Sequence, residues 1–288
     1  MRLVFVHGID NQGRSEQIVI DEWLNALSFA LSPADMAKLR QAEIVAPYYG
    51  DVLYQAVVGE SQAGPEPIAQ SAVVDGDEAK FYLEALQEMA PAAGVTQADI
   101  LAEAPAGEAI EQGLPHNRRL IAVFRALERI SPFHGRHVLK FLPQAFVYLN
   151  RPATADAIDK IVRPALTAQP CVIVAHSLGT VVTFKLLRNE VAARSPSYIT
   201  LGSPLAVRAV KNAIGPVFAR PNQIPSWLNG IDLDDAVTIG RVLTAATFGP
   251  GIDNLDDIDN GSDEPHAVRM YLRDRRIAEA IVRAVSNG

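Results

Sequence analysis

The sequence predicts an α/β protein with a mostly parallel sheet that carries helices on both faces. Two observations lead to this fold class. Short runs such as 171–175 are apolar at every position, which is typical of strands buried on both faces. These runs alternate along the chain with segments whose apolar residues recur at helical spacing. Strands and helices that alternate in this way fold as a parallel sheet between two helical layers.

The N-terminal elements begin with an apolar run at 3–6, which predicts a buried strand. A broad apolar face over 15–30 predicts a helix, and residues 43–47 predict a second strand. Residues 59–70 are rich in Gly, Pro, Ser and Gln, a composition that favours a flexible connection.

Residues 77–149 contain three helical patterns and no convincing strand. Pro143 interrupts the third pattern and should kink that helix or end it. We interpret 60–150 as a helical cap or lid inserted in a single domain of residues 1–288. The apolar faces of this insertion suit either a cover over an acyl pocket or packing on the core, and the sequence leaves both open.

The rest of the chain alternates between the two kinds of element, and a long helix is expected to close it. The expected elements are a helix at 153–167, a strand at 171–175, a helix at 179–193, a strand at 198–201, a short helix at 204–213, a strand at 227–231 and a helix at 267–285.

The amino-acid composition limits the classes of protein to which this chain can belong. The 288 residues suit one large domain, and 49% hydrophobic and 20% charged residues predict a sizeable core rather than disorder. The formal net charge is -7 and no basic stripe is visible, so nucleic acid is not an expected partner. No run of roughly 18 apolar residues predicts a membrane helix, and no secretory leader is visible, so we expect a cytoplasmic protein. The single cysteine, Cys171, excludes an internal disulfide.

The most informative stretch is 175–179 (Ala-His-Ser-Leu-Gly), which lies between a buried strand and a helix. A sharp strand-to-helix turn would put Ser177 in a strained backbone position above the sheet. Its neighbours two positions away must be small because the turn brings backbone close to backbone, and they are Ala175 and Gly179. The helix N-terminus also directs free N–H groups at this point, where negative charge would develop.

This stretch resembles the nucleophile elbow of the α/β-hydrolase superfamily. The usual pattern is Gly-x-Ser-x-Gly, and Ala175 replaces the first glycine here, as it does in small bacterial lipases of the Bacillus type. The resemblance covers 1–58 and 150–288. It implies the α/β-hydrolase fold, with Ser177 as the nucleophile.

The resemblance also implies an oxyanion hole made of two backbone N–H groups. One comes from the residue after the nucleophile, Leu178. The segment 4–9 (Val-Phe-Val-His-Gly-Ile) resembles the His-Gly loop of the superfamily, in which Gly8 allows a close approach and Ile9 N–H is the second donor.

In this fold the acid and the base follow the serine in that order. His266 is the one histidine after Ser177 outside the elbow, so it is the expected base. Asp232, Asp234 and Asp235 are candidates for the acid. The surrounding segment resembles the Trp-x-Asn…Asp-x-Val segment of lipase-like proteins, which maps the acid to Asp235 and leaves the other two open.

Two further segments carry alternatives. Residues 202–204 (Gly-Ser-Pro) resemble a turn of lipase-like enzymes, and they suit either the lining of a pocket or a plain turn. Six acidic residues in 253–264 do not follow the spacing of a calcium loop and favour a solvated loop. His176, beside the nucleophile, is expected to be structural.

The resemblance implies a serine hydrolase that cleaves carboxylic esters, small or lipid-like, through an acyl-enzyme on Ser177. Thioesterase, lactonase, amidase and acyltransferase activities stay open, because a fold does not fix a substrate. A non-catalytic ligand-binding module on the same fold is the alternative from another class. The sequence has no Gly-rich phosphate loop and no Cys/His metal set, so neither a cofactor nor a metal is expected. It leaves the oligomeric state open.

Overall fold

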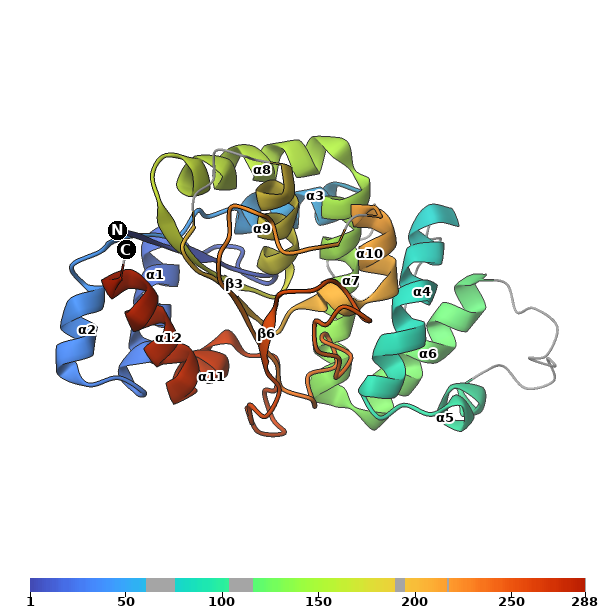
Figure 1. The fold of residues 1–288 in the computed structure, drawn as a ribbon. Helices are drawn as coiled ribbons and strands as arrows, with labels where there is room; N and C mark the ends of the chain where they lie inside the picture. The colour runs from blue at the N-terminus through green and yellow to red at the C-terminus, as the bar shows by residue number, and fades with distance from the viewer. Residues whose placement is uncertain (61–75, 104–115, 190–194, 217, 288) are drawn as a thin grey trace.

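The computed structural model describes residues 1–60, 76–103, 116–189, 195–216 and 218–287. Its centre is a six-stranded sheet in which every neighbouring pair is parallel, in the order β2-β1-β3-β4-β5-β6 (Figure 1). The predicted α/β class with a parallel sheet is therefore confirmed. The strands are β1 (Arg2–Val6), β2 (Glu43–Val45), β3 (Cys171–His176), β4 (Tyr198–Leu201), β5 (Trp227–Gly230) and β6 (Asp253–Leu255).

Alternating side chains of the strands enter two separate cores. Leu3 and Phe5 of β1 pack in the core on one face, whereas Val4 and Val6 pack in the core on the other. Successive side chains of a strand point to opposite faces, so a strand that is apolar throughout needs helices on both sides. The first face is covered by α1 (Glu16–Ser28), α2 (Pro33–Leu39), α11 (Val268–Arg273) and α12 (Arg275–Ser286).

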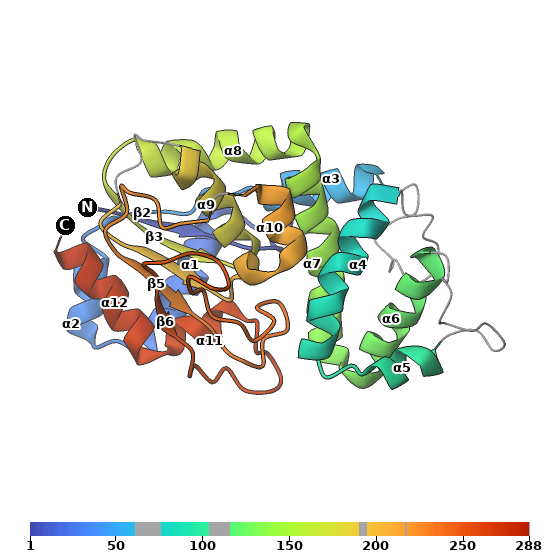
Figure 2. The same cartoon turned by 45° about the vertical axis from the view of Figure 1, so that its right-hand side comes forward.

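The second face carries the larger helical layer, and α4, α5 and α6 lie beyond α7 on the side away from the sheet (Figure 2). Tyr82 of α4 and Phe124 of α6 belong to the same apolar cluster as Val4 and Ala175 of the sheet. The described part of the predicted insertion is thus helical and shares a core with the sheet. The helices are α3 (Gly50–Glu60), α4 (Gly76–Ala92), α5 (Gln97–Ala102), α6 (His116–Ile130), α7 (Pro132–Asn150), α8 (Pro152–Thr167), α9 (Leu178–Asn189), the 3-10 turn η2 (Pro204–Ala206) and α10 (Arg208–Ile214).

Two predicted helices differ in the structure. The closing helix expected at 267–285 is broken at Asp274, which is extended and accepts the backbone N–H groups of Arg276 and Ile277 at 2.8 and 3.3 Å. An aspartate that caps a helix start in this way separates α12 from α11. Pro143, in contrast, does not end its helix, because α7 continues through it to Asn150.

Other differences concern short elements. The acidic segment 253–264, expected to be a loop, supplies the edge strand β6, in which Asn254 is aligned with Asn229 of β5. Helix α2 was not predicted, because only two of its residues, Met36 and Leu39, are buried. The expected connection at 59–70 lies outside the described residues except for its first two positions, which end α3. In the described part of the chain, every helix is too short or too polar to cross a lipid bilayer.

The order of the strands fixes where a site can form. Strands β1 and β3 are neighbours, but the chain continues from β1 to β2 on one side and from β3 to β4 on the other. At such a switch point the connections diverge and leave a crevice at the carboxyl ends of the strands. Residues 7–9 follow β1 there, and Ser177 follows β3.

Candidate active site

Ser177 occupies the single residue between the end of β3 and the start of α9. Its φ is 53°, in the left-handed region that residues with a side chain rarely adopt. The turn also requires Gly179, because a Cβ placed there would lie 2.4 Å from the carbonyl oxygen of Val6. The strained, tightly packed turn that the elbow pattern predicted is therefore present, with Ser177 fully buried at its tip.

A continuous chain of hydrogen bonds joins Ser177, His266 and Asp235. Ser177 Oγ lies 2.8 Å from His266 Nε2, and His266 Nδ1 lies 2.7 Å from Asp235 Oδ2. Asp235 comes from the loop after β5, and His266 comes from the loop between β6 and α11. All three side chains are buried, so little water competes for these hydrogen bonds.

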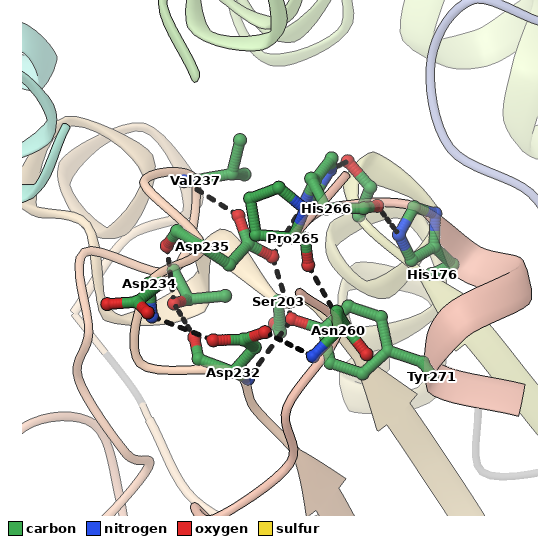
Figure 3. Close-up of polar contacts among 12 residues, drawn as sticks. His176, Ser203, Asp232, Asp234, Asp235, Val237, Asn260, Pro265, His266 and Tyr271 are labelled. Atoms are coloured by element: carbon green, nitrogen blue, oxygen red, sulfur yellow. Dashed lines mark hydrogen bonds and ion pairs between the residues drawn. The ribbon is translucent and has the colours of Figure 1, made fainter. Parts of the chain in front are cut away.

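Of the three candidate acids, Asp235 alone contacts His266 in the structure (Figure 3). Its Oδ1 accepts the backbone N–H of Val237 at 3.0 Å, and its Oδ2 also accepts the hydroxyl of Tyr271 at 2.8 Å. Asp235 therefore has three donors around its two oxygens, and these fix the orientation of the carboxylate.

The neighbouring aspartates have other partners. Asp232 Oδ2 accepts the backbone N–H of Asn260 at 2.7 Å, and its Oδ1 accepts that of Asp234 at 2.8 Å (Figure 3). Burial raises the pKa of Asp232, and the two N–H groups oppose that shift. Asp232 thus organises the loops that carry Asp235 and His266, whereas Asp234 is exposed.

The loop after β1 is held by polar contacts around one peptide group. His7 Nε2 accepts the backbone N–H of Tyr49 at 3.2 Å, which leaves His7 Nδ1 to donate to Gly8 O at 2.8 Å. The Asn11 side chain donates to the same oxygen at 3.3 Å. Because a trans peptide directs its C=O and N–H in opposite directions, fixing Gly8 O also fixes the direction of Ile9 N–H.

This loop lies directly against Ser177. A Cβ placed on Gly8 would lie 2.6 Å from Ser177 Cβ and 3.2 Å from Ser177 Oγ, so only glycine fits. Within the described residues, the N–H groups of Ile9 and Leu178 have no hydrogen-bond acceptor. These two donors, one from the loop after β1 and one from the start of α9, can stabilise an oxyanion formed next to Ser177.

Two more histidines, His176 and His137, lie close to His266. The buried His176 uses its Nε2 to donate to the carbonyl oxygen of His266 at 2.9 Å, which holds the backbone of the base (Figure 3). His137 of α7 lies with its ring centroid 5.8 Å from that of His266. Burial lowers the pKa of His137 to about 4, helped by the neighbouring His266. Burial likewise lowers the pKa of His176, so both imidazoles are neutral near pH 7.

The segment 202–204 lies beside the acid and the base. Gly202 has a φ of 55°, and a Cβ there would lie 3.1 Å from Asp235 Oδ2 and 3.2 Å from His266 Nδ1. Ser203 Oγ lies 2.8 Å from Thr180 Oγ1 of α9. Gly202 therefore leaves the space in which Asp235 and His266 meet.

Sequence reasoning missed the residues that support this centre from other elements. Tyr271 lies within the helix predicted at 267–285, and His137 lies directly before the apolar residues that mark the third helical pattern of 77–149, so neither stands out in the sequence as a site residue. Lys140 and Gln144 of α7 contact Asp10, next to Ile9. No pattern along the chain indicates these contacts, because each joins residues far apart in sequence. Among the described residues, no group of three or more His, Cys, Asp or Glu side chains is placed to hold a metal ion.

Neither a comparison with protein-family models nor a comparison with curated protein sequences finds a match to this chain. We therefore infer the function of the protein from the geometry of the site.

Proposed function

We propose that the protein is a serine hydrolase that cleaves carboxylic esters, built on the α/β-hydrolase fold with residues 60–150 as a helical cap. The observation that carries the proposal is the buried chain from Ser177 Oγ through His266 to Asp235, with contacts of 2.8 and 2.7 Å. A nucleophile at a strained turn, a base and an orienting acid form the constellation of covalent acyl transfer.

In the first half-reaction, Ser177 Oγ attacks the acyl carbon while His266 Nε2 accepts the serine proton. The carbonyl π electrons move to the oxygen, and the N–H groups of Ile9 and Leu178 stabilise the resulting oxyanion. When the carbonyl re-forms, the C–O bond to the alcohol breaks, and His266 donates its proton to the departing oxygen. The products are an acyl-enzyme on Ser177 and a free alcohol.

In the second half-reaction, a water molecule gives one proton to His266 and attacks the acyl carbon. The ester bond to Ser177 breaks, and His266 returns the proton to Ser177 Oγ. Asp235 keeps the proton of His266 on Nδ1 in the resting state and stabilises the imidazolium in both halves. One water is consumed, and one carboxylic acid is released.

Helix α7 is a part of the proposed cap that lies next to His266. His137 brings this helix there, with 5.8 Å between the two ring centroids, and we propose that α7 borders the path by which substrate reaches Ser177. Thioesters, lactones and amides would meet the same nucleophile, and acyl transfer to another alcohol would use the same acyl-enzyme. The preferred bond therefore has to be measured.

The test is hydrolysis of p-nitrophenyl esters of increasing acyl length. The acyl group that is cleaved fastest is then also tested as a thioester and as an anilide, together with a lactone of matching chain length. The wild type is compared with Ser177→Ala and with Ser195→Ala. Ser195 is also a buried serine, and its hydroxyl donates to Ser197 O at 2.7 Å. Turnover that disappears in Ser177→Ala and persists in Ser195→Ala supports the serine mechanism, and the most reactive bond identifies the activity.

A fluorophosphonate probe provides a second readout that does not depend on the substrate chosen. Such a probe phosphonylates an activated serine, and peptide mapping then locates the label. Absence of turnover on every substrate, together with no label on Ser177, would overturn the hydrolase proposal. That result would favour a binding module that retains the pocket.

A further inference from the structure

Tyr271 lies on α11, the helix that follows His266, and its side chain is fully buried. Its hydroxyl donates to Asp235 Oδ2 at 2.8 Å, the same oxygen that accepts from His266 Nδ1. The hydroxyl oxygen also accepts the backbone N–H of Asp232 at 3.2 Å. Tyr271 thus connects the acid to the start of its own loop, as Figure 3 shows.

The phenol is a donor throughout the working pH range. Burial raises the pKa of Tyr271 well above its usual value, and the nearby Asp235 raises it further. The hydroxyl oxygen of Tyr271 accepts the N–H of Asp232, and its own proton points to Asp235 Oδ2.

We propose that Tyr271 is a positioning residue of the catalytic centre: its hydroxyl fixes the rotation of the Asp235 carboxylate and shares its negative charge. Among the described residues, Oδ1 has one donor, the N–H of Val237, and Oδ2 without Tyr271 would keep His266 as its sole donor. Tyr271 therefore limits how strongly Asp235 stabilises the imidazolium form of His266. This inference rests on the proposed hydrolase function only where hydrolysis is the readout.

The titratable groups that face Asp235 and His266 come from two other elements and from the loop of Asp235 itself. His176 at the end of β3 has its ring centroid 4.7 Å from that of His266, and His137 of α7 is 5.8 Å away. Asp232 and Asp234 lie on the loop of Asp235 itself. Because burial depresses the pKa of both His176 and His137, neither carries charge near neutral pH. A change in the pH profile near neutral pH therefore reports on the pair and not on these two histidines.

The test replaces the hydroxyl alone, with Tyr271→Phe. We expect kcat/KM at the optimum to fall about tenfold, because a hydrogen bond to a charged group is lost and the carboxylate can rotate. We also expect the midpoint of the acid limb of the kcat/KM profile to move to higher pH, because more charge on Oδ2 favours the imidazolium. The matched control is Tyr148→Phe, which removes a buried hydroxyl that donates to the carboxylate of Asp159 at 2.8 Å. It should leave the acid limb unchanged.

Two further measurements keep the inference independent of turnover and of folding. NMR of the His266 ring protons, assigned by their loss in His266→Gln, gives the midpoint of its protonation even if no ester is hydrolysed. Site-specific 3-fluorotyrosine at position 271 makes the phenol a stronger donor in nearly the same shape. It should move that midpoint to lower pH, opposite to Tyr271→Phe.

The outcomes separate the two proposals. A wild type that hydrolyses nothing defeats the proposed function, while the His266 midpoints still decide the role of Tyr271. Midpoints that do not move in either variant at position 271 would overturn the positioning role. Equal movement in Tyr148→Phe would overturn it too, because the effect would then follow from general loosening of the fold.

Discussion

Lys140 Nζ of α7 lies 2.6 Å from Asp10 Oδ2, and this ion pair ties the predicted cap to the residue that follows Ile9. The buried Gln144, one turn further along α7, accepts the backbone N–H of Asp10 at 3.3 Å. Asp10 has a φ of 62°, a conformation that needs such support. The helix that borders the site thus also supports the loop that carries Ile9 N–H.

Replacing Lys140 tests this support. We expect Lys140→Met to lower kcat two- to fivefold with little change in KM, because a half-exposed ion pair contributes up to about 1 kcal/mol. Asp10→Asn should have a similar effect, and the double variant should be no worse than either single one. Lys38→Met removes the ion pair of 2.8 Å with Asp35 in α2 and serves as the control. An equal loss in that variant would refute the coupling.

The choice of acid can be tested by removing one charge at a time. Asp235→Asn should lower kcat by about 10⁴, because an amide cannot hold His266 in the tautomer that accepts the serine proton. Asp234→Asn should leave steady-state kinetics unchanged, because its side chain is exposed. Comparable losses in the two variants would mean that the acid has been misassigned.

Alanine substitutions at Gly202 and Gly94 form a matched pair that tests the packing beside Asp235 and His266. Both have positive φ, 55° and 80°, so alanine at either position costs about 1–2 kcal/mol of stability. A Cβ at Gly94 meets nothing within 4 Å, whereas one at Gly202 would press on Asp235, His266 and Tyr271. Chemical denaturation should therefore show a greater loss of stability in Gly202→Ala than in Gly94→Ala, while esterase assays at 25 °C should show at least a tenfold loss in Gly202→Ala alone. Full activity in Gly202→Ala would contradict the packing argument.

The buried His7 should make the free energy of unfolding depend on pH. Burial lowers its pKa from 6.5 to about 4, so between these values the unfolded chain binds a proton that the folded chain excludes. Stability from this group is complete above pH 6.5 and is lost as the pH falls toward 4, by about 3 kcal/mol in all. Urea unfolding at several pH values should show this slope in the wild type and a shallower one in His7→Gln. Parallel slopes would assign the acid sensitivity to other groups.

The sequence determined the elements that depend on local pattern. Strands β1, β3 and β4 were recognisable because they are apolar on both faces, and each had to lie between two helical layers. The turn at Ser177 was recognisable because backbone crowding demands small neighbours such as Gly179. The break at Asp274 was missed, since a single capping side chain barely alters the apolar periodicity.

The tertiary structure alone decided which side chains meet. Asp232, Asp234 and Asp235 are chemically equivalent along the chain, and only the path of the loop after β5 places Asp235 against His266. The roles of Tyr271 and Lys140 likewise follow from packing between elements distant in sequence. Local patterns arise from the periodicity of one strand or helix, so a sequence displays them directly. A hydrogen bond between distant loops depends on how whole layers pack, which no single segment encodes.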